Sequence, residues 1–372
     1  MLNSLYQKDQ KYLNLAINLA RKSLINCSPN PRVGCVIVNN DVILATAITA
    51  PNGRPHSEII AINKVANKSL LINATMYLTL EPCCFYEWKK SAGCVDEIIA
   101  HKFARVVIAN IDHNPNINGK SVEILQKSGI EVVIIESEIG KQLHQEFFKV
   151  QKTSLPYLTL KIASSLDGKI ATKNFSSQWI TNEQARKYSH LLRAQNDAIL
   201  IGANTLRHDN PSLTCRINGI EQYSPKKVIV SNSLNFDLNY KIFNDSSNLI
   251  IVTCESNQNN KFFKNFLGKA IFVKKNHTLE QNIDLESALK LLAQHKINSI
   301  LVEGGSKIIT QLIKNNLIDK IIWAKSQIII GNDGIPAIAE LGIADIKNAI
   351  NNFELQEIIR FDDNLIEILQ KE

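Results

Sequence analysis

The stretch ATMYLTLEPC, residues 74–83, joins a short apolar run to a Glu-Pro-Cys ending. Because the run is apolar and stops at a proline, we expect a buried strand followed by a turn. His56-Ser57-Glu58 lies upstream, at the predicted start of a helix, and Cys94 lies downstream. Cys83 therefore lies at the end of the predicted strand, where His56 and Cys94 can lie close to it.

This combination, His-x-Glu followed by Pro-Cys, is the pattern of zinc-dependent base deaminases. His56, Cys83 and Cys94 would hold Zn²⁺ and leave its fourth position to water, whose pKa falls to about 7. Glu58 would be the catalytic group that moves protons. Each residue alone is more often structural, so the hypothesis depends on their conjunction. Cys84 is an alternative ligand, although the Pro-Cys position favours Cys83.

Length and composition bound the possible classes. The chain has 372 residues, which at about 100–200 residues per domain predicts two domains. With 45% hydrophobic residues a folded chain is expected. The net charge of +7 indicates either a solvated lysine surface or phosphorylated ligands. The sequence has no block of basic residues interleaved with aromatic ones, so nucleic-acid binding is not expected. No apolar run approaches the length needed to span a membrane, and an odd number of cysteines, seven, does not suit a disulfide framework. We therefore expect a cytoplasmic protein.

The hydrophobic pattern predicts two α/β series. An N-terminal amphipathic helix is indicated by the spacing of Leu13, Ala16, Ile17 and Ala20. Two strands around the turn Asn39–Asp41 follow, and strand-like and helix-like runs then alternate to about residue 140. The pattern is lost from Phe147 to Pro156, where we place the domain boundary. A second series follows and ends in two strands joined by FDDN.

Several motifs of the first half belong together: PNPRVGCVIV, GRPHSE, ATMYLTLEPC and VVIANIDHNPNINGK. Up to about residue 145 they resemble the deaminase domain of the bifunctional bacterial riboflavin-biosynthesis enzymes. The resemblance implies a cytidine-deaminase-like, three-layer α/β/α domain over residues 1–147 that removes the amine of a phosphoribosylated diaminopyrimidine. Asn30, in the proline-rich turn, is the expected substrate contact of this domain.

One loop departs from this family. The family usually has Pro-Cys-Ser-His-x-Gly-Arg-Thr-Pro-Pro-Cys, whereas this chain has PCCFYEWKKSAGC, which is two residues longer between the expected ligands. Phe85 takes the place of the family's histidine, and Thr49 that of another histidine further upstream. Metal ligation and proton transfer are expected to be retained. The alternative is an enzyme with the second activity alone and a structural or inactive zinc domain.

The second half contains LKIASSLDGKIA, SSQWIT, LLRAQNDAILIGANT, DNPSLTCR and ILVEGG. In this order they resemble the reductase domain of the same enzymes, over residues 155–372, whose α/β fold is similar to dihydrofolate reductase. The resemblance implies NADPH contacts at Ala163, Trp179, Thr205, Asp209, Glu303, Gly304 and Gly305. It implies contacts to the phosphorylated pyrimidine at Ser177, Arg193, Leu213, Arg216 and Glu303.

The residues themselves agree with this chemistry in part. There is no G-x-G-x-x-G fingerprint, but Gly304 and Gly305 at a strand-to-helix junction let backbone N–H groups approach a phosphate. Two arginines can clamp phosphate. The implied reaction is hydride transfer from NADPH to C1′ of the ribose, with Asp209 or Glu303 as candidate proton donor. Asp167 in Leu-Asp-Gly-Lys is interpreted as a turn residue.

The resemblance also implies a homo-oligomer. A competing hypothesis from another class is a nucleic-acid base deaminase with an appended binding domain, for which a basic aromatic surface and no dependence on NADPH are expected.

Overall fold

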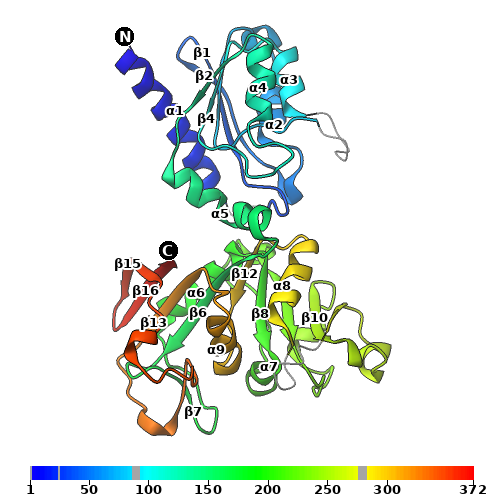
Figure 1. Ribbon diagram of the computed structural model, residues 1–372, viewed down its shortest axis with the longest axis vertical. Helices are drawn as coiled ribbons and strands as arrows, with labels where there is room; N and C mark the ends of the chain where they lie inside the picture. Colours follow the sequence, from blue (N-terminus) through cyan, green and yellow to red (C-terminus); the bar gives the residue numbers. More distant parts are fainter. Residues whose placement is uncertain (1, 24–25, 86–92, 275–282) are drawn as a thin grey trace. The chain divides into compact units, whose positions relative to one another are not determined.

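The computed structural model describes residues 2–23, 26–85, 93–274 and 283–372 (Figure 1). The chain divides into two compact units, unit 1 from Met1 to Ser154 and unit 2 from Leu155 to Glu372. Among the described helices, none combines the length and the apolar character that crossing a membrane requires.

Unit 1 is built on a five-stranded sheet of order β2-β1-β3-β4-β5. The strands are β1 (Gly34–Asn39), β2 (Val42–Ile48), β3 (Thr75–Leu78), β4 (Arg105–Ile108) and β5 (Glu131–Ile134). β1 is antiparallel to β2 and β3, whereas β3, β4 and β5 are parallel. The predicted first hairpin is confirmed, and its turn residues Asn40 and Asp41 have positive φ angles of 49° and 65°, as hairpin turns of this length require.

Helices cover both faces of this sheet (Figure 1). They are α1 (Leu2–Lys22), α2 (Ser57–Lys64), α3 (Cys94–Ala100), α4 (Lys120–Lys127) and α5 (Glu138–Thr153). α1 packs against Val36 and Tyr77, while α2, α3 and α4 pack on the opposite face, where Cys35 and Met76 point. The predicted three-layer α/β/α architecture is confirmed. A Cβ at Gly34 would lie 2.1 Å from the Ala16 carbonyl oxygen, so this contact between α1 and β1 requires glycine.

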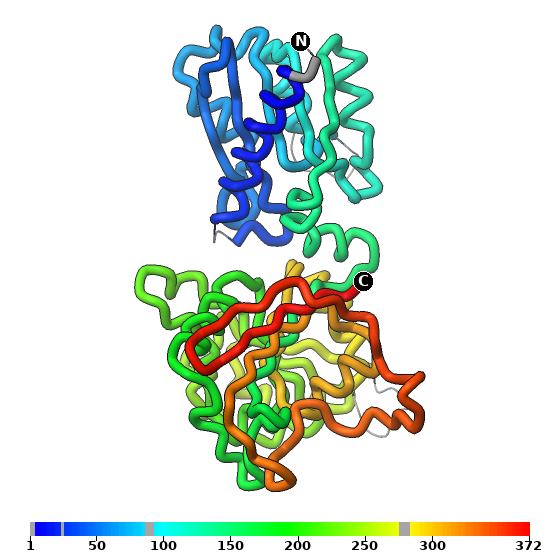
Figure 2. Tube along the Cα trace, turned by 90° about the vertical axis from the view of Figure 1, so that its left-hand side faces the viewer, coloured from blue at the N-terminus to red at the C-terminus, as the bar shows by residue number. Residues whose placement is uncertain are grey.

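Unit 2 is built on a nine-stranded sheet of order β11-β10-β9-β8-β12-β6-β13-β16-β15. The strands are β6 (Tyr157–Ser164), β8 (Ala198–Gly202), β9 (Lys226–Val230), β10 (Leu249–Cys254), β11 (Lys269–Val273), β12 (Ser299–Val302), β13 (Lys320–Lys325), β15 (Phe353–Phe361) and β16 (Asn364–Lys371). The first seven in spatial order are parallel, and β16 and β15 add the predicted antiparallel pair, drawn in red in Figure 2. β7 (Lys169–Thr172) and β14 (Gly334–Pro336) form a separate antiparallel pair.

Two layers of helices bury this sheet. α8 (Leu285–Gln294) and α9 (Ser306–Lys314) pack on one face, and α6 (Glu183–Gln195) and α7 (Ala203–Asp209) on the other. Strands covered on both faces read as continuous apolar runs, and β8 and β10 are buried along their whole length. The carboxyl ends of β6, β12, β8 and β9 therefore meet at one edge of the sheet, from which the loops of the unit 2 site emerge.

The stretch from Phe147 to Pro156, predicted to lose its pattern, is helical up to Thr153. The prediction is wrong there because the buried stripe of α5 includes Gly140 and His144 besides Phe147 and Phe148, and glycine and histidine do not read as apolar positions.

A buried ion pair joins α1 to the sheet of unit 1. Two Arg105 nitrogens donate to the two Asp9 oxygens at 2.6 and 2.8 Å, and the Tyr77 hydroxyl donates to the same carboxylate at 3.0 Å. The Asp9 side chain is 2% exposed and that of Arg105 is 11% exposed. Removing Asp9 leaves the buried guanidinium of Arg105 with the exposed Glu131 carboxylate, 3.0 Å from its Nε, as its remaining acidic partner, and a half-compensated buried charge is costly.

We expect Asp9→Ala to lower the free energy of unfolding of unit 1 by about 3 kcal/mol. Urea unfolding of the full chain, with hydrogen exchange of α1, β3 and β4 to localise the effect, measures it. Lys127→Ala is the control, because Lys127 and Glu123 form an exposed helical pair and its loss should cost at most about 0.5 kcal/mol. Equal losses in the two variants would contradict the role given to the buried pair.

Candidate active sites

Three side chains predicted as metal ligands meet in unit 1. His56 precedes α2, Cys83 follows β3, and Cys94 is the first residue of α3. The two Sγ atoms each lie 3.3 Å from His56 Nδ1 and 3.4 Å from each other. These three form the one His/Cys/Asp/Glu group of metal-binding geometry among the described residues.

The triangle fits a zinc ion. Tetrahedral zinc with bonds of about 2.0–2.3 Å separates its ligand atoms by about 3.5–3.8 Å, slightly more than the 3.3–3.4 Å observed. The hydrogen bond with Cys83, then burial and the charge of Glu58, raise the pKa of Cys94. The thiols of Cys83 and Cys94 and the carboxylate of Glu58 thus surround the imidazole of His56. When the two thiols are ionised, a bound cation compensates their negative charge.

Glu58 lies beside the triangle without being part of it. It stands in the first turn of α2, two residues after His56, and its side chain is buried. The Ser57 hydroxyl donates to Glu58 Oε2 at 2.9 Å, and the charge of Glu58 contributes to the raised pKa of Cys94. This is the place expected of a proton-transfer group that does not bind the metal.

Asn30 contacts the ligand histidine. Its Nδ2 donates to the Gly53 carbonyl at 2.8 Å and lies 3.3 Å from His56 Nε2. Gly53 has a φ of +80°, and a Cβ there would lie 2.6 Å from Asn30 Cβ. The Thr49 hydroxyl accepts from Val33 N–H at 2.9 Å and donates to the Pro31 carbonyl at 3.1 Å. Thr49 therefore holds the proline-rich turn that presents Asn30.

The remaining cysteines do not join the cluster. Cys84, the alternative ligand, is 2% exposed and packs in the apolar core of unit 1. Cys27, Cys35, Cys215 and Cys254 are buried, as predicted. Phe85 is 64% exposed, and residues 86–92, which form most of the departing loop, lie outside the described residues.

Glu81 anchors the segment that carries Cys83. Its buried carboxylate accepts backbone N–H groups from Asp112 at 3.1 Å, Gly119 at 2.9 Å and Ser121 at 3.1 Å. A turn 30 to 40 residues away is thereby fixed to the end of β3. The sequence motif contained this glutamate, but its structural role was not predicted.

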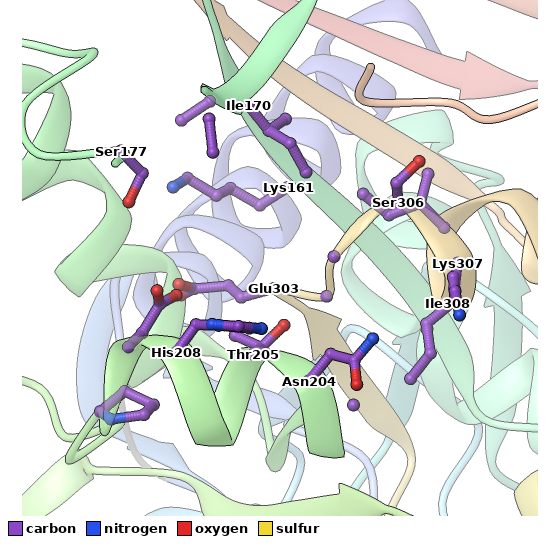
Figure 3. Close-up of a pocket in the computed structure, with 18 of the residues that line it drawn as sticks. Lys161, Ile170, Ser177, Asn204, Thr205, His208, Glu303, Ser306, Lys307 and Ile308 are labelled. Carbon is purple, nitrogen blue, oxygen red and sulfur yellow. The ribbon is translucent and has the colours of Figure 1, made fainter. Parts of the chain in front are cut away.

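Unit 2 holds a cavity of about 1090 Å³, slightly above the range of about 300–1,000 Å³ that is typical of ligand pockets. Figure 3 shows part of its lining. All residues predicted to contact cofactor or substrate in unit 2 line it: Ala163, Ser177, Trp179, Arg193, Thr205, Asp209, Leu213, Arg216, Glu303, Gly304 and Gly305.

A buried charge cluster lies in this cavity. Arg193 Nε and Nη2 donate to the two Glu303 oxygens at 2.8 and 2.9 Å, and Nη1 donates to the Thr214 carbonyl at 3.0 Å. Burial raises the pKa of Glu303, but the charge and hydrogen bonds of Arg193 and the charge of Lys161 outweigh it and hold this pKa at about 2. Glu303 is therefore ionised at neutral pH, and Arg193 has fewer donors for a phosphate than predicted.

Sequence reasoning missed Lys161. Its side chain extends into the cavity between Ser177 and Glu303 (Figure 3). Burial lowers the pKa of Lys161, and Arg193 adds to this effect while Glu303 opposes it. The signal was present, because Lys161 is the one charged residue of the largely buried strand YLTLKIAS.

The Gly304–Gly305 loop ends at the first residue of α9, Ser306. The Ser306 hydroxyl is buried without a hydrogen-bond partner among the described residues and borders the cavity. A Cβ at Gly305 would lie 3.4 Å from Thr205 Oγ1, so the loop runs close to α7. An orphaned hydroxyl beside N–H groups at a helix start fits the phosphates of a dinucleotide.

Other predicted residues are placed as follows. Arg216 is exposed at the cavity and makes a 3.4 Å hydrogen bond to the Ser212 hydroxyl. Trp179 is 64% exposed with the Arg186 guanidinium 4.3 Å from its ring centre. Burial raises the pKa of Asp209. Asp167 accepts from Ser165 and from the N–H groups of Ile330 and Gly331 and is a turn residue, as predicted.

Two family models match the chain. The cytidine and deoxycytidylate deaminase zinc-binding region matches residues 6–110, and the RibD C-terminal domain matches residues 156–366. Two curated proteins named riboflavin biosynthesis protein RibD are similar over most of their length. The protein from Aquifex aeolicus is 35% identical, covering 92% of this chain and 93% of the relative, and that from Escherichia coli K12 is 30% identical, covering 94% and 96%.

Solved structures agree with this similarity. RibD of Acinetobacter baumannii, form 1, superposes with a TM-score of 0.88 at 28% identity, covering 98% of this chain and 99% of the other. The Thermotoga maritima diaminohydroxyphosphoribosylaminopyrimidine deaminase/5-amino-6-(5-phosphoribosylamino)uracil reductase superposes with a TM-score of 0.84 at 30% identity, again covering 98% and 99%.

We expect Glu81→Gln to lower zinc affinity about 10- to 100-fold, because a carboxamide turns a donor toward N–H groups and loosens the segment carrying Cys83. Competition with a zinc chelator measures the affinity. Glu97→Gln, on the exposed side of α3, is the matched control. Unchanged zinc affinity in Glu81→Gln would show that the ligands hold their places without this carboxylate.

Proposed function

Because the chain belongs to the RibD family of riboflavin-biosynthesis proteins, we infer that it is a bifunctional enzyme with a zinc-dependent deaminase and an NADPH-dependent reductase. Unit 1 hydrolytically deaminates 2,5-diamino-6-ribosylamino-4(3H)-pyrimidinone 5′-phosphate. Unit 2 reduces 5-amino-6-(5-phosphoribosylamino)uracil to the ribitylamino product. The observation that carries this assignment is the coexistence, on one chain, of a His-Cys-Cys triangle beside a buried glutamate and a charged cavity beside a glycine loop.

In unit 1 we assign His56, Cys83 and Cys94 as zinc ligands and Glu58 as the proton-transfer residue. Zinc, when bound, supplies a Lewis acid that makes water reactive at neutral pH. Glu58, fixed by Ser57, takes a proton from the attacking water and delivers it to the leaving amine. Asn30 steadies His56 and offers its amide to the pyrimidine edge. The complete set argues against the alternative of a structural zinc domain, although the loop after Cys84 departs from the family.

In unit 2 the charge cluster orients and protonates the substrate. NADPH, when bound, supplies the hydride. Arg193 keeps Glu303 ionised, so Glu303 accepts hydrogen bonds from substrate and is not the proton donor. We assign the proton that reaches the ribose ring oxygen to Lys161 Nζ, in place of the Asp209 or Glu303 expected from sequence. Arg216, on the exposed rim, is the phosphate contact.

The remaining predicted contacts keep their assignments within this proposal. Ser177 and Leu213 border the substrate, and Ala163, Trp179, Thr205 and Asp209 border NADPH along with the Gly304–Gly305 loop. We also propose that the chain works in the cytoplasm as a homo-oligomer. The support is the family resemblance and the intracellular occurrence of NADPH and phosphorylated pyrimidines.

We expect Glu58→Ala to lower the deaminase rate by at least about 100-fold, because general acid–base catalysis is lost, and to leave the reductase rate unchanged. Ammonia release from the diaminopyrimidine, measured with zinc present, tests the first half, and NADPH oxidation with the deaminated substrate tests the second. Equal ammonia release by the two proteins would instead favour a structural zinc domain.

We expect the reductase rate to fall as pH rises through the lowered pKa of Lys161, because the ammonium form that donates the proton is lost. Lys161→Met should slow the reductase by about 100-fold or more and abolish this alkaline limb. Lys161→Arg, which keeps a charge, is the comparison. A pH profile of kcat from pH 6 to 10 tests the assignment, and an unaltered alkaline limb in Lys161→Met would refute it.

A further inference from the structure

The order of strands fixes which parts of the unit 2 cavity are neighbours. β6 carries Lys161 and Ala163, β12 leads to the Gly304–Gly305 loop, β8 leads to α7, and β9 leads to Ser231. These four strands are adjacent in the order β6, β12, β8, β9. The cavity therefore has a catalytic end at β6 and an opposite end at β9.

A dinucleotide whose pyrophosphate lies at the Gly304–Gly305 loop must place its two nucleosides on either side. This step rests on the proposed reductase function. The nicotinamide belongs toward β6, where Lys161 and Glu303 lie together (Figure 3). The adenosine then falls over β8 and β9. Neighbouring strands are about 4.8 Å apart, so β9 lies about 10 Å from β12, a distance that the adenosine ribose can span from the pyrophosphate.

Arg207 is the guanidinium at this opposite end. It projects from α7 to the loop after β9, where Nη1 donates to the Asn235 carbonyl at 3.1 Å and Nη2 donates to the Asn204 side-chain oxygen. Two of its five N–H donors are used in these bonds, and both Arg207 and Asn204 line the cavity. The bonds hold the guanidinium plane in place, which favours recognition of a phosphate.

The surroundings of Arg207 select for a phosphate over a hydroxyl. Sites for NAD place a carboxylate near the ribose 2′-hydroxyl, whereas residues 231–235, directly after β9, read Ser-Asn-Ser-Leu-Asn and contain none. Asp237, further along this loop, is not among the described residues that line the cavity. Of the two carboxylates among the described lining residues, Glu303 is engaged by Arg193, and Asp209 lies at the other end of α7 from Asn204.

We propose that Arg207 binds the 2′-phosphate of NADPH and makes the reductase prefer NADPH to NADH. Two other cations that line the cavity compete for this role, Lys241 and Lys307. The Lys241 backbone N–H donates to Asn210, which caps the carboxyl end of α7, whereas Asn204 is at the start of that helix. Lys307 is the second residue of α9, beside Ser306 (Figure 3). It lies on the pyrophosphate side, which both dinucleotides share, and cannot discriminate between them.

Calorimetric titration of the full chain with NADP⁺ and NAD⁺ at fixed ionic strength tests the proposal. Arg207→Gln should raise the Kd for NADP⁺ about tenfold or more, as expected for loss of a charged hydrogen bond, and change the Kd for NAD⁺ less than about twofold. Retained NAD⁺ binding shows that the variant is folded. Arg207→Lys should give an intermediate Kd for NADP⁺, and Lys307→Gln, the matched control, should keep the wild-type ratio of the two constants.

An equal loss of affinity for both dinucleotides in Arg207→Gln, or no loss for either, overturns the assignment. A lowered preference for NADP⁺ in Lys307→Gln in place of Arg207→Gln overturns it as well. Failure of the unaltered protein to bind NADP⁺ is a different result, because it rejects the proposed NADPH-dependent function together with this inference.

Discussion

A carboxylate taken out of water must be compensated, and this requirement shapes the site of each unit. In unit 1 the Glu81 carboxylate is compensated by three backbone N–H groups, which fix a distant turn to the end of β3. In unit 2 the Glu303 carboxylate is compensated by Arg193, which joins α6 to the loop after β12. Both interactions close loops at the carboxyl ends of parallel strands, where side chains from several elements converge.

The same argument explains why the departing loop of unit 1 is tolerated. The ligand triangle depends on the end of β3, held by Glu81, and on the start of α3, where Val95 N–H donates to the Cys83 carbonyl at 3.2 Å. Neither contact involves residues 86–92. The sequence between Cys84 and Gly93 can therefore lengthen and lose its arginine while both cysteine ligands keep their places. Such a change affects what approaches the metal more than the metal site itself.

Sequence reasoning succeeded where the signal is local. His56-x-Glu58 and Pro82-Cys83 place chemistry at the ends of regular elements, and the alternation of apolar runs predicted both α/β architectures. It failed where the deciding contact is distant. Arg193 and Glu303 are 110 residues apart, so nothing near Arg193 shows that its guanidinium is engaged by a carboxylate. Lys161 was overlooked because its strand was interpreted as part of the core. A lysine in a buried strand is costly unless it is paired or functional, and this makes it a candidate site residue.

The distribution of charge within unit 2 bears on the interpretation of the net +7. Seven lysines and arginines line the unit 2 cavity among the described residues, against two acidic residues: Lys161, Arg186, Arg193, Arg207, Arg216, Lys241 and Lys307, against Asp209 and Glu303. Unit 1 carries a net charge of +4 and unit 2 a net charge of +3, so the excess of the whole chain is shared by both units. Within unit 2, however, the net +5 of the cavity exceeds the net charge of the whole unit, and the rest of that unit is net negative. This local concentration of positive charge matches phosphorylated ligands and places the attraction for them at the unit 2 site.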